Sequence, residues 1–180
     1  VQTCALPISE VAPILRGLAA IPEDPADGVF KRFVFEFRSD PAILNFVNGA
    51  EVARYSQAGV ITPDHVIRTK AQPLLVPAPE AGKLDAFAAA ANGAFAKFAD
   101  GYKQYFERNN ARAVPKKKML DTVPRVVLVP GLGLFAFGKS SKDAKIAADI
   151  ADNGVRTIID AEAIGKFESV SEADIFDVED

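Results

Sequence analysis

Residues 124–140 read PRVVLVPGLGLFAFGKS, and this stretch decides the fold. Val126–Val129 is an apolar run typical of buried strands, and Leu134–Phe137 is a second β-prone run. The glycines of Gly131-Leu132-Gly133 predict a turn between the two runs, and Gly138 is expected to end the second strand. We therefore predict a β-hairpin in this part of the chain.

The same stretch also matches a nucleotide-binding pattern. Residues 133–140, GLFAFGKS, satisfy the P-loop pattern G-x-x-x-x-G-K-[ST], in which backbone N–H groups surround phosphate before a helix begins. A helix is expected to follow, because Ser140 and Asp143 have the spacing of a capping box. A phosphate loop would, however, expose two phenylalanines and a leucine, each worth about 1.5–3 kcal/mol when fully buried. The hairpin is the favoured interpretation, and a P-loop phosphotransferase is kept as an alternative.

Composition limits the possible functions. The chain has 180 residues, of which 49% are hydrophobic and 25% charged, and this balance suits one α/β domain with a sizeable core. A net charge of −3 argues against nucleic acid as a partner. One Cys and one His are too few for a disulfide framework or a self-contained zinc site. No apolar run approaches the roughly 18–20 residues of a membrane span, and a cytoplasmic location is expected.

The ends of the chain look unlike the middle. Residues 1–8, VQTCALPI, lack the regions of a signal peptide and resemble a non-native leader encoded by a sequencing adapter. We expect a linker at 9–29, an α/β domain at 30–165, and a second linker at 166–180. These divisions indicate a fragment of a larger protein, although a genuine irregular tail is also possible.

Periodicity predicts strands that alternate with helices. The sequence indicates a strand within 30–38, a short helix after a cap at Ser39 or Asp40, a second short helix at 51–57, a strand start at 60–61, and an apolar run at 74–76. Longer helices are expected at 84–108 and at about 141–164. The aromatic stripe of the first long helix is interpreted as core packing. Because the hairpin is antiparallel, the expected class is α/β with a mixed sheet flanked by helices.

The densest polar cluster lies in DHVIRTK, residues 64–70. The side chains in this segment that can carry charge, donate or accept hydrogen bonds are those of Asp64, His65, Arg68, Thr69 and Lys70. If the segment is extended, Arg68 and Lys70 share one face and form a candidate site for a phosphate or carboxylate. The alternative is structural, with Arg68 paired to Asp64 and His65 capping a loop. No second ligand accompanies His65, so a complete metal site is excluded here.

Several segments together resemble a known family. DPAILNFVNG, TPDHVIRTKAQPLLVP, YKQYFERN and PRVVLVPGLGLFAFGKSSKDAKIAADI resemble bacterial fused enzymes of the class II aldolase/short-chain dehydrogenase type, which act as rhamnulose-1-phosphate aldolase and lactaldehyde dehydrogenase. The resemblance covers nearly all of 13–179. It implies a middle segment, between a metal-binding aldolase part and a dinucleotide-binding part.

The hairpin carries a second resemblance. VLVPGLGLFAFGKSSKDA is similar to the late strand–turn–strand–helix of class II aldolase/adducin domains, whose turn usually reads Asn-His-Gly with the His bound to zinc. Leu132 occupies the place of that imidazole, and a leucine cannot ligate a metal. The family's His-x-His pair is absent too, and no G-x-G-x-x-G fingerprint occurs in the chain.

These resemblances imply a connecting, non-catalytic domain of a fused sugar-phosphate aldolase and dehydrogenase of deoxy-sugar catabolism. We expect this piece to hold no cofactor, while the parent uses a divalent metal such as zinc and NAD(P). The expected partners are the flanking aldolase and dehydrogenase domains, and homo-oligomers are left open. The alternative is an adducin-like scaffold that mediates assembly without catalysis.

Overall fold

The computed structural model describes residues 8–24 and 26–179, with Asp24 and Asp64 described by their backbone alone. Nearly all of the leader expected at 1–8, Cys4 included, therefore lies outside the described residues. Ile8 is the exception, because it begins the first helix.

The described chain alternates strands and helices. The elements are α1 (Ile8–Leu18), β1 (Ile21–Asp24), β2 (Val29–Lys31), β3 (Val34–Arg38), α2 (Pro41–Val47), α3 (Val52–Tyr55), the 3₁₀ turn η1 (Pro63–His65), α4 (Val66–Thr69), β4 (Leu74–Leu75), α5 (Leu84–Asn110), β5 (Val126–Val129), β6 (Gly133–Gly138), α6 (Ser141–Ile164) and α7 (Glu172–Val178). The predicted long helices at 84–108 and 141–164 are confirmed as α5 and α6.

The main sheet is mixed, as the sequence predicts. Its strand order is β3-β6-β5-β4, in which β6 runs antiparallel to both β3 and β5 while β4 runs parallel to β5. The hairpin of β5 and β6 occupies the centre of the sheet, and every residue of both strands is buried. Because Leu134–Phe137 pairs as a strand, residues 133–140 do not form a phosphate loop.

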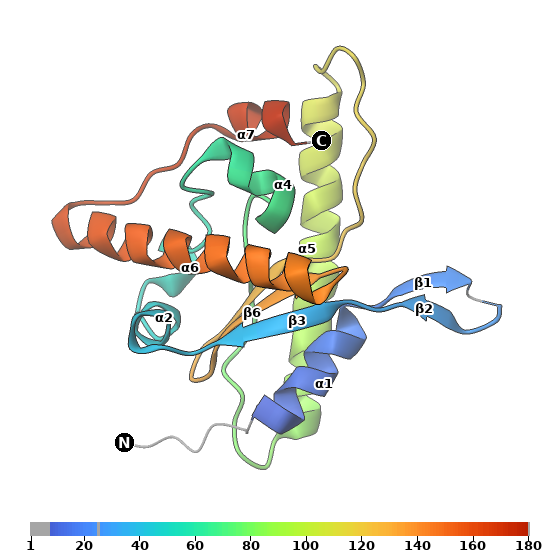
Figure 1. Cartoon of the computed structure of the whole chain (residues 1–180), viewed down its shortest axis with the longest axis vertical. Helices are drawn as coiled ribbons and strands as arrows, with labels where there is room; N and C mark the ends of the chain where they lie inside the picture. The colour runs from blue at the N-terminus through green and yellow to red at the C-terminus, as the bar shows by residue number, and fades with distance from the viewer. Residues whose placement is uncertain (1–7, 25, 180) are drawn as a thin grey trace.

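Helices cover both faces of this sheet. Along β6, Phe135 and Phe137 pack against α1 and α5, whereas Leu134 and Ala136 pack against α2 and α6. This alternation follows from the period-2 geometry of a strand. Figure 1 shows α6 crossing one side of the sheet with α5 on the other, so the domain has three layers.

Capping residues position the helices around the sheet. Asp40 Oδ1 accepts from the N–H groups of Ala42 and Ile43, and Pro41 starts α2. Ser140 Oγ accepts from the N–H of Asp143 and begins α6, which confirms the cap expected there. Residues 60–61, by contrast, form no strand.

Secondary structure also occurs where linkers are expected. In 9–29, α1 buries Val11 and Leu15, and β1 pairs with β2 in a hairpin that projects from the body (Figure 1). In 166–180, α7 buries Ile175 and Phe176, and Phe176 packs against Tyr102 and Tyr105 of α5. The helices α1 and α7 bury apolar side chains in the domain, whereas Val29 and Phe30 of the β1–β2 hairpin are exposed.

Candidate functional site

The segment 62–70 winds into short helices instead of running extended. Pro63 starts the η1 turn, Val66 is buried, and α4 follows directly to Thr69. Lys70 then takes a left-handed backbone with φ 62°, which breaks the helix. The expectation that Arg68 and Lys70 share one face of a strand is therefore wrong.

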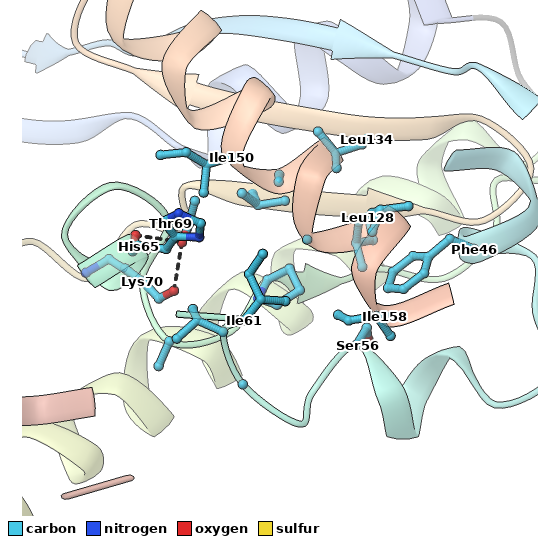
Figure 2. Close-up of a pocket in the computed structure, with 18 residues that line it drawn as sticks. Phe46, Ser56, Ile61, His65, Thr69, Lys70, Leu128, Leu134, Ile150 and Ile158 are labelled. Carbon is cyan, nitrogen blue, oxygen red and sulfur yellow. Dashed lines mark hydrogen bonds between the residues drawn. The ribbon is translucent and has the colours of Figure 1, made fainter. Parts of the chain in front are cut away.

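The predicted polar residues diverge. The Arg68 guanidinium is about half exposed and lies 3.7 Å from the Asp143 carboxylate at the start of α6. The Thr69 hydroxyl donates to the carbonyl of His65 at 3.0 Å and lies 3.2 Å from that of Lys70 (Figure 2). The side chain of Asp64 lies outside the described residues. The structure thus brings His65, Thr69 and Lys70 together and sends Arg68 to the surface.

His65, Thr69 and Lys70 border a small cavity of about 70 Å³. Its other walls are mostly apolar and come from α2, the loop 59–61, the central strands and α6, as Figure 2 shows for Phe46, Ile61, Leu128, Leu134, Ile150 and Ile158. Burying an unpaired phosphate among such side chains is unfavourable. This cavity does not suit an anion.

Lys70 is the most unusual of the predicted residues, because its side chain is buried. Its ammonium donates to the carbonyl of Asp121 at 2.7 Å and lies 3.5 Å from the centre of the Tyr102 ring. A cation at that distance is attracted to the ring face. Burial, together with the charge of Arg125, lowers the pKa of Lys70 to about 8, while Asp121 and Glu179 oppose that shift.

An ion pair fixes the neighbouring loop. Arg125 donates to both carboxylate oxygens of Asp121, at 2.9 and 2.6 Å, and stacks over the Phe33 ring. Burial opposes ionisation of Asp121, but the hydrogen bonds and charge of Arg125 outweigh it and lower the pKa of that carboxyl. Asp121 therefore stays ionised beside Lys70.

A buried carboxylate completes this cluster. The hydroxyls of Tyr102 and Tyr105 donate to the two oxygens of Glu179, at 2.8 and 2.7 Å. Burial first, and then these hydrogen bonds, raise the pKa of both tyrosines. The bonds tie the residues after α7 to α5. We name Lys70, Tyr102, Tyr105, Asp121, Arg125 and Glu179 the lysine–tyrosine cluster.

A larger cleft of about 580 Å³ lies beside this cluster. One wall is a face of α5, and residues 57–59 and 70–75 form the opposite wall. Lys70, Tyr102 and Tyr105 contribute to the lining, and Val170, Glu172 and Ile175 also border the cleft. The volume lies within the range of small-molecule sites.

The turn between β5 and β6 is built for packing. Gly131 and Gly133 have φ values of 82° and 141°, and the N–H of Gly131 donates to Asn48 Oδ1 at 2.7 Å. Leu132 is half-buried and packs against the cluster under α1 and α5. Within 8–24 and 26–179 there is no group of three or more His, Cys, Asp or Glu side chains placed to hold a metal. The donor set at this turn does not fit zinc.

Sequence reasoning missed most of the lysine–tyrosine cluster. Tyr102 and Tyr105 lie on the expected aromatic stripe and were interpreted as core alone, while Asp121, Arg125 and Glu179 drew no prediction. The available signal was two tyrosines three residues apart on a long helix, because a buried phenol needs a hydrogen-bond partner. The identity of that partner could not be read from the sequence.

Comparisons with known proteins agree with the fold. Residues 7–179 match the family described as "Aldolase class II, second domain". An uncharacterized oxidoreductase of Bacillus subtilis, YuxG, is 28% identical over 173 residues; the match covers 96% of this chain but 24% of that protein. The chain thus spans about a quarter of the curated relative's length.

None of the described helices is long and apolar enough to cross a bilayer.

A solved structure supports the architecture. The crystal structure of YgbL, a putative aldolase/epimerase/decarboxylase from Escherichia coli, superposes with a TM-score of 0.53 at 11% identity. The superposition covers 81% of this chain and 56% of that one. The mixed sheet with flanking helices is thus a class II aldolase-like fold.

Proposed function

Because the chain belongs to the family of class II aldolase second domains, we propose that it is the connecting, non-catalytic domain of a larger cytoplasmic protein. That protein fuses a metal-dependent sugar-phosphate aldolase with an NAD(P)-dependent short-chain dehydrogenase of deoxy-sugar catabolism. The aldolase and dehydrogenase parts flank this domain and supply the zinc and nicotinamide chemistry.

The turn 131–133 carries this proposal. Its central side chain is the half-buried Leu132, which is packed against the hydrophobic core. A zinc site of the aldolase type needs three protein ligands, and neither this turn nor the surroundings of His65 offers them among the described residues. The relative named as an oxidoreductase is about four times longer than the part matched here, which is consistent with chemistry carried out elsewhere in such a protein.

Two measurements on the isolated chain test the metal part of the proposal. The chain is purified from zinc-supplemented cells, desalted, and analysed by mass spectrometry for zinc, manganese and cobalt. We expect far less than one metal ion per chain. Stoichiometric metal that survives desalting and is lost in His65→Gln would overturn the proposal.

The non-catalytic role is tested in the longer gene product. Retro-aldol cleavage and aldehyde oxidation are measured separately in the wild type and in His65→Gln and Arg68→Ala. These variants remove the one imidazole of the chain and an exposed guanidinium. We expect kcat within about twofold of wild type for both reactions, as for surface substitutions away from a site. A tenfold loss in a folded variant would place catalysis in this domain, whereas absence of both activities from the whole protein would favour the adducin-like scaffold.

A further inference from the structure

The cleft along α5 has the shape of a ligand site. Lys97, Gly101, Gln104 and Arg108 line it from successive turns of α5, at spacings of four, three and four residues. That spacing places them on one face of the helix. The opposite wall is formed by residues 57–59 and by the segment 70–75, which leads into β4, and Phe98 and Pro73 add apolar surface. We name this space the α5 cleft.

Gly101 leaves the middle of the α5 cleft open. A glycine in a helix interior lowers helix stability relative to alanine. Gly138, at the end of β6, has a packing reason to be glycine, because a side chain there would overlap the backbone of α6 at Ala144. At Gly101 a Cβ would meet nothing within 4 Å. Packing within this chain therefore does not require glycine there, and its effect is to keep space on the cleft floor.

The charges around the α5 cleft favour an anion. Lys70, Lys97 and Arg108 are its cations and Glu172 is its carboxylate, although the whole chain carries a net charge of −3. Arg108 is already paired with Glu172 at 2.9 Å, and the Lys70 ammonium donates to a backbone carbonyl. Lys97 and Gln104 make no side-chain hydrogen bond or ion pair with any part of the chain that the structure describes. Their donors flank Gly101 and are free for a ligand.

We propose that the α5 cleft binds a small organic anion, a metabolite with one phosphate or carboxylate group. Lys97 and Gln104 donate to the anionic group above Gly101, while the carbon skeleton lies against Phe98 and Pro73. Arg108, which is paired with Glu172, also lines the cleft one helical turn beyond Gln104. This site is independent of the turn at 131–133 and of the proposed connecting role.

Binding is tested on the isolated chain by ¹H–¹⁵N NMR titration at constant ionic strength. The probes are inorganic phosphate, glycerol 3-phosphate, glycerate and neutral glycerol. We expect saturable shifts at 97–108 and 70–75 with millimolar dissociation constants, about −4 kcal/mol in binding free energy, for at least one anion and none for glycerol. The comparison of glycerol 3-phosphate with glycerate identifies whether phosphate or carboxylate is preferred.

Matched variants locate the site. Lys97→Gln should weaken binding about tenfold, the effect of losing one charge-assisted hydrogen bond. Lys103→Gln removes a lysine that pairs with Asp100 on the same helix and lies outside the cleft, so it should bind as wild type. Gly101→Leu should abolish binding and raise Tm, whereas Gly93→Leu, at another helical glycine with open space, should raise Tm and leave binding unchanged.

The same titrations can overturn the proposal. Absence of saturable shifts with every anion at about 50 mM, well above a millimolar dissociation constant, would do so. Shifts that persist in both Lys97→Gln and Gly101→Leu would also contradict it, because the anion would then bind elsewhere.

Discussion

The ammonium of Lys70 lies 3.5 Å from the centre of the Tyr102 ring, on the inner side of the helix that lines the cleft. The left-handed backbone at Lys70 turns the chain at the end of α4, and the side chain reaches the carbonyl of Asp121. A lysine buried in this way has a lower pKa because its charged form loses hydration. The stability of the domain should therefore depend on pH above neutrality.

We predict that Lys70 makes stability rise between pH 7.5 and 9.5. Its pKa is about 8 in the folded state and has an ordinary value of 10.5, so the unfolded chain binds more protons in this window. Relative to Lys70→Met, the free energy of unfolding of the wild type should increase by about 2 kcal/mol across it. Urea unfolding at each pH measures this difference.

The rise in stability should end above this pH window. Tyr102 and Tyr105 have raised pKa values in the folded state, so above about pH 10 these phenols lose protons in the unfolded chain while they stay protonated in the folded one. The free energy of unfolding of the wild type should therefore fall with pH in that range. Exposed Lys103→Met is the matched control and should run parallel to the wild type. A Lys70→Met curve that also stays parallel to the wild type would rule out a lowered pKa.

Tyr105→Phe should loosen α7. The substitution removes a hydroxyl that donates to Glu179 at 2.7 Å and leaves a buried carboxylate oxygen without a partner. The expected loss is about 1–3 kcal/mol. Hydrogen exchange within 172–178 should accelerate. Tyr55→Phe removes a hydroxyl bonded to Phe46 O on the other side of the sheet, and it should leave exchange in α7 unchanged.

Gly133→Ala should destabilise the hairpin. Gly133 has φ 141°, and a Cβ there would overlap the carbonyl oxygen of Arg38 on β3. Strain of this kind costs about 1–3 kcal/mol, before any movement of β3. Gly154→Ala, at an α6 glycine with open space around it, should stabilise by about 0.5–1 kcal/mol. Equal Tm values for the two variants would contradict the strained turn.

Phe135→Ala should lower stability by about 3–5 kcal/mol, because the ring is fully buried between the sheet and α5. Lys139 follows the strand and is exposed, so Lys139→Ala should have little effect on stability.

Mg–ATP should shift the Tm of neither the wild type nor Lys139→Ala. A shift with ATP that disappears in Lys139→Ala would restore the P-loop interpretation of 133–140.

The local sequence predicted secondary structure correctly where a residue pattern is compatible with one kind of element. The apolar runs at 126–129 and 134–137 with glycines between them predicted the central hairpin, and Ser140 with Asp143 predicted the start of α6. Local pattern was a poor guide at 62–70. There Pro63 and buried Val66 favour short helices, and the side chains of Arg68 and Lys70 point to different environments.

The amino-acid sequence by itself determined the central hairpin, the two long helices, the mixed class of the sheet and the absence of an imidazole at the turn 131–133, since strand periodicity, caps and residue identity are local properties. Only the tertiary structure decided that Lys70 lies over Tyr102, that Glu179 bonds two tyrosines, and that Lys97 and Gly101 border a cleft. These contacts join residues far apart in the chain. Their partners, burial and charge balance are set by how α5 packs against loops that carry no periodic signal.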